Sequence, residues 1–280
     1  MYHQTGSAFH EVIARQQHWA QRRRISLDSR YPEYVTRLED NLVRALSSDT
    51  RTEYEEGGGH ELDPQDNGRP PKLLALHSSD ALLCNLFEYW RHQSTSLLAR
   101  ALNAAPGCNL LKFQQKRVIN PAWRTPPHLD CELQGGTPAT AVESKFTEPY
   151  NPERKPYTLH GVYAERQDLW GDLPHCGQLA RRLHDNVDYF AILDAPQLLR
   201  HILGLLSFYR SPEDFRLIYL WYEVPDQEGD YHRREIERFR ELVDARLNFE
   251  SRTHQDVFRN LADSLKAHSE YRDYMVERYF

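Results

Sequence analysis

The sequence predicts a mixed α/β (α+β) fold, in which helices flank a central β-sheet of mixed strand direction. Three observations predict it. A hairpin pattern spans residues 126–150, a strongly apolar run spans residues 215–224, and a helical pattern precedes each of them. With 280 residues, of which 40% are hydrophobic, the chain can form one large domain or two ordinary ones with a sizeable core.

Residues 1–72 are predicted to be a helical N-terminal extension with a connector. Apolar residues at helical spacing indicate one helix over residues 8–24 and a second over residues 33–46. Residues 50–71 contain G-G-G, D-P, N-G and P-P and have no apolar period, which is typical of a loop. Residues 73–280 are then expected to form the main domain.

The main domain is expected to begin with a helix that Ser78 or Ser79 caps and that carries Leu82, Leu86 and Trp90. Glu88 lies on this helix. It is either a solvent-facing residue paired with Arg91 or a carboxylate directed at a functional site. Later in the chain we expect a strand over 109–119, an insertion near 150–190 with a helix at 178–183, and helical structure from residue 233 to the end.

The run over 215–224 is expected to form the centre of the sheet, and an apolar helix that begins at Pro196 is expected to cover it. A continuous apolar run predicts a strand that is buried on both faces, as in parallel pairing, with the preceding helix as its crossover. Gln197, in the first turn of that helix, either caps a neighbouring backbone group or touches the active site.

The hairpin carries the residues that indicate chemistry. If its loop is 135–138, Asp130 lies directly opposite Glu143, and alternation puts Lys145 on the same face with His128 opposite it. The opposite face is expected to be the core side; its members are Leu129, Cys131, Leu133, Val142 and Phe146. Like charges that face each other destabilise a sheet, so a bound cation beside Lys145 is the expected compensation.

Composition excludes little. The net charge of −6 does not indicate a nucleic-acid-binding protein, although phosphate binding needs only a local basic surface. The four cysteines show no C-x-x-C spacing and are expected to be free thiols. A zinc site using His128 and Cys131 is disfavoured because alternation puts them on opposite faces. Neither a secretory signal nor a membrane span is visible, so a soluble, cytoplasmic protein without membrane association is expected.

The residues P-H-L-D (127–130), E-S-K (143–145) and the flanking A-V-E-S-K-F-T-E-P-Y resemble the core of the PD-(D/E)XK nuclease superfamily. Within it, residues 73–224 resemble a bacterial group of candidate restriction endonucleases. Two departures stand out. The proline lies three residues before Asp130, and Gln197 is followed by His201 where the RecB-like branch has Gln-x-x-x-Tyr. RecB-type exonuclease activity is therefore not implied.

The resemblance implies a restriction-endonuclease-like core and a Mg²⁺-dependent deoxyribonuclease of restriction or defence type. In it, Asp130, Glu143 and the backbone carbonyl of Ser144 ligate Mg²⁺, for which Mn²⁺ can substitute. Lys145 orients the attacking water or neutralises charge on the phosphate. Glu88 matches the helix acid that some members use at the metal.

DNA is the implied partner, and restriction enzymes often act as homodimers. The expected phosphate contacts are Lys112, Lys116, Arg117 and Arg124. Three alternatives remain open: a nucleic-acid-binding protein that keeps the nuclease fold without cutting, a glycosidase that uses Asp130 and Glu143, and a structural ion pair in which Lys145 neutralises both carboxylates. The sequence indicates neither the target nor whether DNA or RNA is cut.

Overall fold

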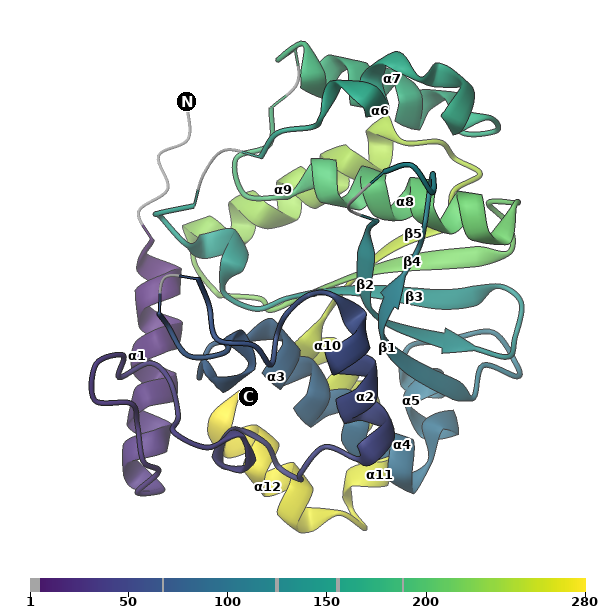
Figure 1. The fold of residues 1–280 in the computed structure, drawn as a ribbon. Coiled ribbons are helices and arrows are strands. Elements are labelled where there is room, and N and C mark those ends of the chain that lie inside the picture. The colour runs from purple at the N-terminus through teal and green to yellow at the C-terminus, as the bar shows by residue number, and fades with distance from the viewer. Residues whose placement is uncertain (1–5, 67, 124–125, 155–156, 188) are drawn as a thin grey trace.

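The computed structural model describes residues 6–66, 68–123, 126–154, 157–187 and 189–280. In this part of the chain, one five-stranded sheet carries helices on both faces (Figure 1). The strands lie in chain order. The first three are antiparallel and the last three are parallel, so the sheet is mixed. The predicted fold class is confirmed. No helix in the described ranges is both long and apolar enough to cross a membrane.

The strands are β1 (Leu110–Lys116), β2 (His128–Gln134), β3 (Ala139–Lys145), β4 (Phe215–Trp221) and β5 (Phe249–Thr253). The α-helices before the sheet are α1 (Ser7–Arg22), α2 (Ser48–Gly57), α3 (Ser79–Leu83), α4 (Tyr89–Gln93) and α5 (Thr95–Ala101), and a π-helical turn, Cys84–Glu88, joins α3 to α4. The remaining α-helices are α6 (Gly161–Glu165), α7 (Pro174–His184), α8 (Ala195–Tyr209), α9 (Gln227–Leu242), α10 (His254–Asn260), α11 (Ala262–Leu265) and α12 (Ser269–Arg278).

Strand β4 is the centre of the sheet. All of its residues are buried, and it pairs in parallel with β3 on one side and β5 on the other. Leu217 and Tyr219 pack on one face of the sheet, whereas Ile218 and Leu220 pack on the other. Helix α8 is the crossover between β3 and β4. The prediction of a central, doubly covered strand is confirmed, and burial on both faces explains its unbroken apolar run.

Two hydrophobic cores lie on the two faces of the sheet. The first core lies against α3, α4, α5, α10 and α12, and α1 and α2 also contribute to it. The second core lies against α6, α7, α8 and α9 (Figure 1). The predicted extension of residues 1–72 thus shares a core with the main domain, and the boundary at residue 72 stays a prediction about folding units.

The hairpin has the predicted loop and register. Strand β2 ends at Gln134, β3 begins at Ala139, and Cys131 pairs with Val142. This is the register that places Asp130 opposite Glu143. Cys131–Val142 is the last pair at that end, so β2 and β3 part where the two acidic residues lie.

The predicted core face of the hairpin is wrong at one residue. Leu129 belongs to the second core, whereas Cys131 belongs to the first. The neighbouring strand explains the change, because Gln114 has a left-handed backbone (φ 51°) and it and Asp130 are left out of the β1–β2 pairing. Such a residue interrupts the pleat, so strict alternation fails at the outer end of the hairpin.

Two N-terminal predictions are also wrong. The expected loop over 50–71 contains most of α2, which begins with Ser47 accepting a hydrogen bond from the Thr50 N–H and ends at Gly58 (φ 84°). The expected helix over 33–46 is absent apart from a 3₁₀ turn, Leu38–Asn41. Instead, Tyr34 and Val35 form isolated β-bridges.

The C-terminal prediction is correct in part. Helices α9, α10, α11 and α12 follow residue 226, but strand β5 interrupts them and completes the sheet beside β4. The predicted strand over 109–119 and the helix at 178–183 are confirmed as β1 and α7.

A buried ion pair should stabilise this fold strongly. Arg117 and Glu132 form an ion pair with side chains 6% and 0% exposed, and Tyr209 also donates to Glu132. Replacing Glu132 by alanine leaves an uncompensated buried cation, so Glu132→Ala should lower the free energy of unfolding by about 3–5 kcal/mol, measured by urea denaturation. Asp263→Ala, which breaks the exposed pair with Lys266, is the matched control and should change little. Equal losses in the two variants would contradict this.

Candidate active site

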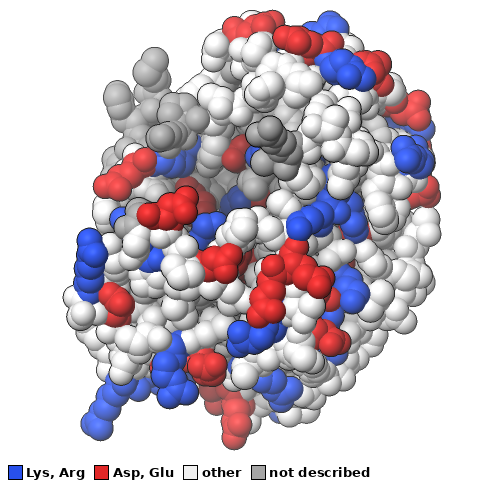
Figure 2. All heavy atoms as spheres, in the orientation of Figure 1, with Lys and Arg blue, Asp and Glu red and all other residues white. Residues whose placement is uncertain are grey.

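A cavity of about 660 Å³ lies where β2 and β3 part. The strands contribute Gln114, His128, Asp130, Glu143 and Lys145 to its wall, and α3 and α8 close it from either side of the sheet. The molecular surface is hollowed on the face shown in Figure 2, where acidic and basic side chains are mixed around the hollow.

Asp130 is held by the neighbouring strand. Its Oδ2 accepts a hydrogen bond from the backbone N–H of Ser144 at 2.6 Å. Burial, and then the charges of Glu143 and Asp80, raise its pKa well above the usual range, although Lys145 opposes the rise. Asp130 therefore loses its proton less readily than an exposed aspartate and favours any cation that enters the cavity.

Glu143 lies between two basic side chains. Lys145 Nζ donates to Glu143 Oε1 at 2.6 Å, and His201 Nε2 lies 2.9 Å from Oε2, which is close enough for an ion pair but outside hydrogen-bond geometry. Burial alone would raise the pKa of Glu143, but Lys145 and His201 lower it to about 2. For Lys145, burial is outweighed by Glu143 and Asp130, which raise its pKa. Glu143 and Lys145 are thus both charged.

The structure brings three of the predicted site residues together. Asp130, Glu143 and Lys145 line one cavity, and so does His128. Gln197 also lines it, which agrees with the second of the two roles considered for this residue. The Ser144 side chain points elsewhere: its buried hydroxyl lies 3.0 Å from His254 Nε2, in a site where burial lowers the pKa of His254 to about 3.

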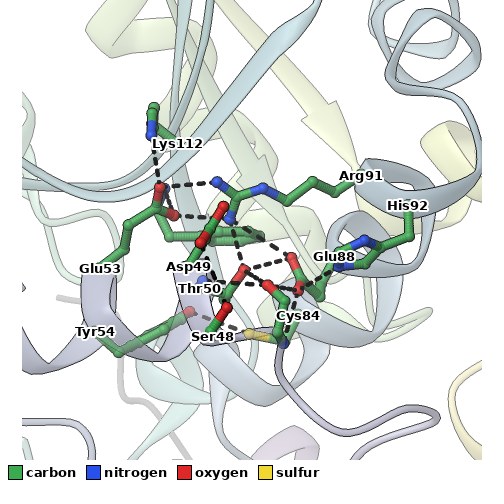
Figure 3. A network of polar contacts seen from close by, with 12 residues as sticks. Ser48, Asp49, Thr50, Glu53, Tyr54, Cys84, Glu88, Arg91, His92 and Lys112 are labelled. Carbon is green, nitrogen blue, oxygen red and sulfur yellow. Dashed lines mark hydrogen bonds and ion pairs between the residues drawn. The ribbon is translucent and has the colours of Figure 1, made fainter.

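The structure does not bring Glu88 to this cavity. Its Oε1 accepts hydrogen bonds from the N–H and the hydroxyl of Ser47. Its Oε2 accepts a hydrogen bond from the hydroxyl of Thr50 at 2.6 Å (Figure 3). Arg91 and His92 lie against it as ion-pair partners. These contacts tie the start of α2 to the π-helical turn, so Glu88 has a structural role that accounts for its burial.

A different acid of the same helical segment lies in the cavity. Asp80, in the first turn of α3, lines the wall, and its Oδ1 accepts from Tyr54 and from Gln114, each at 2.9 Å. Burial, and then the charge of Glu61, raise its pKa to about 8. In the sequence, Asp80 follows the capping residues Ser78 and Ser79. An acid in a first helical turn is expected from the helix dipole alone, so its position does not indicate a functional site.

Three of the predicted phosphate contacts are occupied within the protein. Lys112 pairs with Glu53 at 3.1 Å, Arg117 pairs with Glu132, and Lys116 donates to the carbonyl of Glu56. Arg124 lies outside the described residues. The structure therefore does not present these side chains as a free basic surface.

The donor set of the cavity fits Mg²⁺ better than zinc. Glu143 Oε2 is buried without a hydrogen bond, and nearby negative charges and burial raise the pKa of Asp130. Across the described ranges, no three or more His, Cys, Asp or Glu side chains gather closely enough to hold a metal. Zinc needs such a set, whereas Mg²⁺ commonly takes one or two carboxylates and keeps its waters.

Comparison with known families supports the restriction-endonuclease part of the resemblance. Residues 11–280 match the model of the family described as "Restriction Endonuclease associating with ARP". The chain belongs to this family. The match includes α2 and β5 as well as the hairpin, so the restriction-endonuclease-like family assignment covers nearly the whole described fold. No curated protein and no solved structure matches the chain.

The raised pKa of Asp80 should make stability depend on pH. The carboxyl group of Asp80 has a pKa of about 8 in the folded state and 3.8 as its ordinary value. The stability that its protonation contributes is therefore complete below pH 3.8 and is lost as the pH rises to about 8. Asparagine has no carboxyl proton and does not titrate. In EDTA, the melting temperature of Asp80→Asn relative to wild type should therefore increase from about pH 5 to about pH 8. The exposed Asp66→Asn variant is the control, and a difference that stays constant with pH would refute the assignment.

Proposed function

We propose that the protein is a Mg²⁺-dependent deoxyribonuclease of the PD-(D/E)XK superfamily that hydrolyses phosphodiester bonds in DNA. The observation that carries this proposal is the convergence of Asp130, Glu143 and Lys145 in one cavity at the open end of a hairpin. The family's name is that of a restriction endonuclease, and restriction or defence is the proposed setting.

Asp130 and Glu143, with the backbone carbonyl of Ser144, would hold the metal ion. When bound, Mg²⁺ or Mn²⁺ supplies positive charge that stabilises the transition state and lowers the pKa of water. Glu143 is ionised, because Lys145 and His201 lower its pKa to about 2. A bound cation would offset the burial and the charges of Glu143 and Asp80 that raise the pKa of Asp130. Both carboxyl groups would then offer the oxygen atoms that these hard cations prefer.

Lys145 would act on the phosphate. Its high pKa keeps it protonated, and its side chain, 15% exposed, reaches the cavity while bonded to Glu143. A fixed ammonium group at this position can orient the attacking water and neutralise the charge that develops on the phosphate oxygens. In the proposal, Asp80, and not Glu88, is the acid of this helical segment that acts in the cavity, with a different role. Protonated at neutral pH, its carboxyl group can donate a hydrogen bond to a phosphate oxygen.

DNA is the proposed partner, and a cytoplasmic homodimer would let two sites cut the two strands of a duplex. The alternative is a nucleic-acid-binding protein that keeps the fold without cutting. The presence of Asp130, Glu143 and Lys145 together in the cavity favours cleavage. Measured Mg²⁺ binding without cleavage of a mixed DNA library would favour the alternative.

The proposal predicts a loss of cleavage in two variants. Asp130→Ala and Lys145→Ala should each reduce Mg²⁺-dependent nicking of supercoiled plasmid by at least about 100-fold, because each removes a group that stabilises charge in the transition state. EDTA should abolish nicking by the wild type.

Glu88→Gln is the matched control, because Glu88 is a buried acid that does not line the cavity. It should keep its nicking activity, and circular dichroism should show that all three variants are folded. If both Asp130→Ala and Lys145→Ala cut plasmid like the wild type, the active site is misassigned.

A further inference from the structure

The cavity contains many acidic groups and few basic ones. Its acidic residues are Glu61, Asp80, Asp130, Glu143 and Glu148, and its Lys and Arg residues are Lys72, Lys145 and Arg200. Lys72 donates a hydrogen bond to Glu61 at 2.8 Å, and Lys145 donates one to Glu143. Among the described residues of the wall, Arg200 is the cation that forms neither an ion pair nor a side-chain hydrogen bond.

Arg200 is presented by a rigid element. It lies on α8 between the buried residues Leu199 and His201, and its own side chain is half-buried. The acid at the start of this helix is its N-cap residue Asp194, whose Oδ1 already accepts a hydrogen bond from the N–H of Gln197 at 2.8 Å. Arg200 forms no ion pair with it. The guanidinium group therefore keeps its five N–H donors for a ligand.

We propose that Arg200 binds a phosphate group of the nucleic-acid strand that enters the cavity. Two parallel N–H donors match two phosphate oxygens, which makes arginine better suited than lysine to hold a phosphate in one orientation. A cation here also offsets the repulsion between the acidic wall and a polyanionic substrate. This assignment rests on the proposed function and adds to it a substrate-positioning residue from α8, outside the Asp130–Glu143–Lys145 hairpin.

The test is the salt dependence of binding. A fluorescein-labelled DNA oligonucleotide is titrated with the full-length protein in Ca²⁺ at several salt concentrations, and anisotropy gives the affinity. Arg200→Ala should weaken binding by about 10-fold or more, as for the loss of hydrogen bonds to a charged group. The slope of log K against log[salt] should fall in magnitude by about 0.7–0.9, because one phosphate contact is lost.

Two further variants make the result specific. Arg200→Lys keeps the charge and should keep the salt slope while binding more weakly than wild type. Arg181→Ala removes an exposed arginine of α7 that does not line the cavity, and it should match the wild type in both affinity and slope.

The outcomes separate the two proposals. If the wild type nicks plasmid but Arg200→Ala keeps its affinity and slope, the Arg200 assignment is overturned and the nuclease proposal stands. If Arg200→Ala does not fold, a reduced salt slope in Arg200→Lys overturns the assignment. A wild type that neither binds nor cuts DNA overturns the proposed function and the Arg200 assignment with it.

Discussion

The structure depends on neutralising two neighbouring carboxyl groups that are buried where β2 and β3 part. Lys145 donates a hydrogen bond to Glu143, His201 lies on the other side of Glu143, and Asp130 accepts a hydrogen bond from the N–H of Ser144. Charge compensation is uneven, because the pKa of Glu143 falls to about 2 while that of Asp130 rises. Asp130 is therefore the less well compensated of the two carboxyl groups.

The cost of burying a carboxylate also explains the surroundings of other acids in the chain. Glu88 and Glu132 are buried, and each is surrounded by donors, in one case at the start of α2 and in the other beside Arg117. Asp80 is buried too, but its partners are neutral groups, Tyr54 and Gln114. A buried acid with neutral partners resists ionisation, so the charge state of Asp80 responds to what enters the cavity.

The helix α8 links the fold to the site. Its apolar side fills the second core as the crossover to β4, and its first turns carry Gln197, Arg200 and His201 to the cavity wall. Because the crossover must pack against the sheet, those side chains are held in place by the same burial that stabilises β4. The family match extends over this helix as well as over the hairpin.

Local patterns in the sequence determined the hairpin, its register and the central strand. Gly-rich composition marks the loop at 135–138, alternation sets which residues face each other, and an unbroken apolar run identifies β4. Only the tertiary structure decided that Asp80, and not the predicted Glu88, enters the cavity, because the contacts of α2 with both residues are not visible in the local sequence. Leu129 and α2 depended on it as well. Leu129 changes face through a left-handed residue on another strand. Helix α2 is held by polar contacts and by one core side chain, Tyr54, and not by an apolar stripe. Such contacts join residues far apart in the chain, so no local period records them.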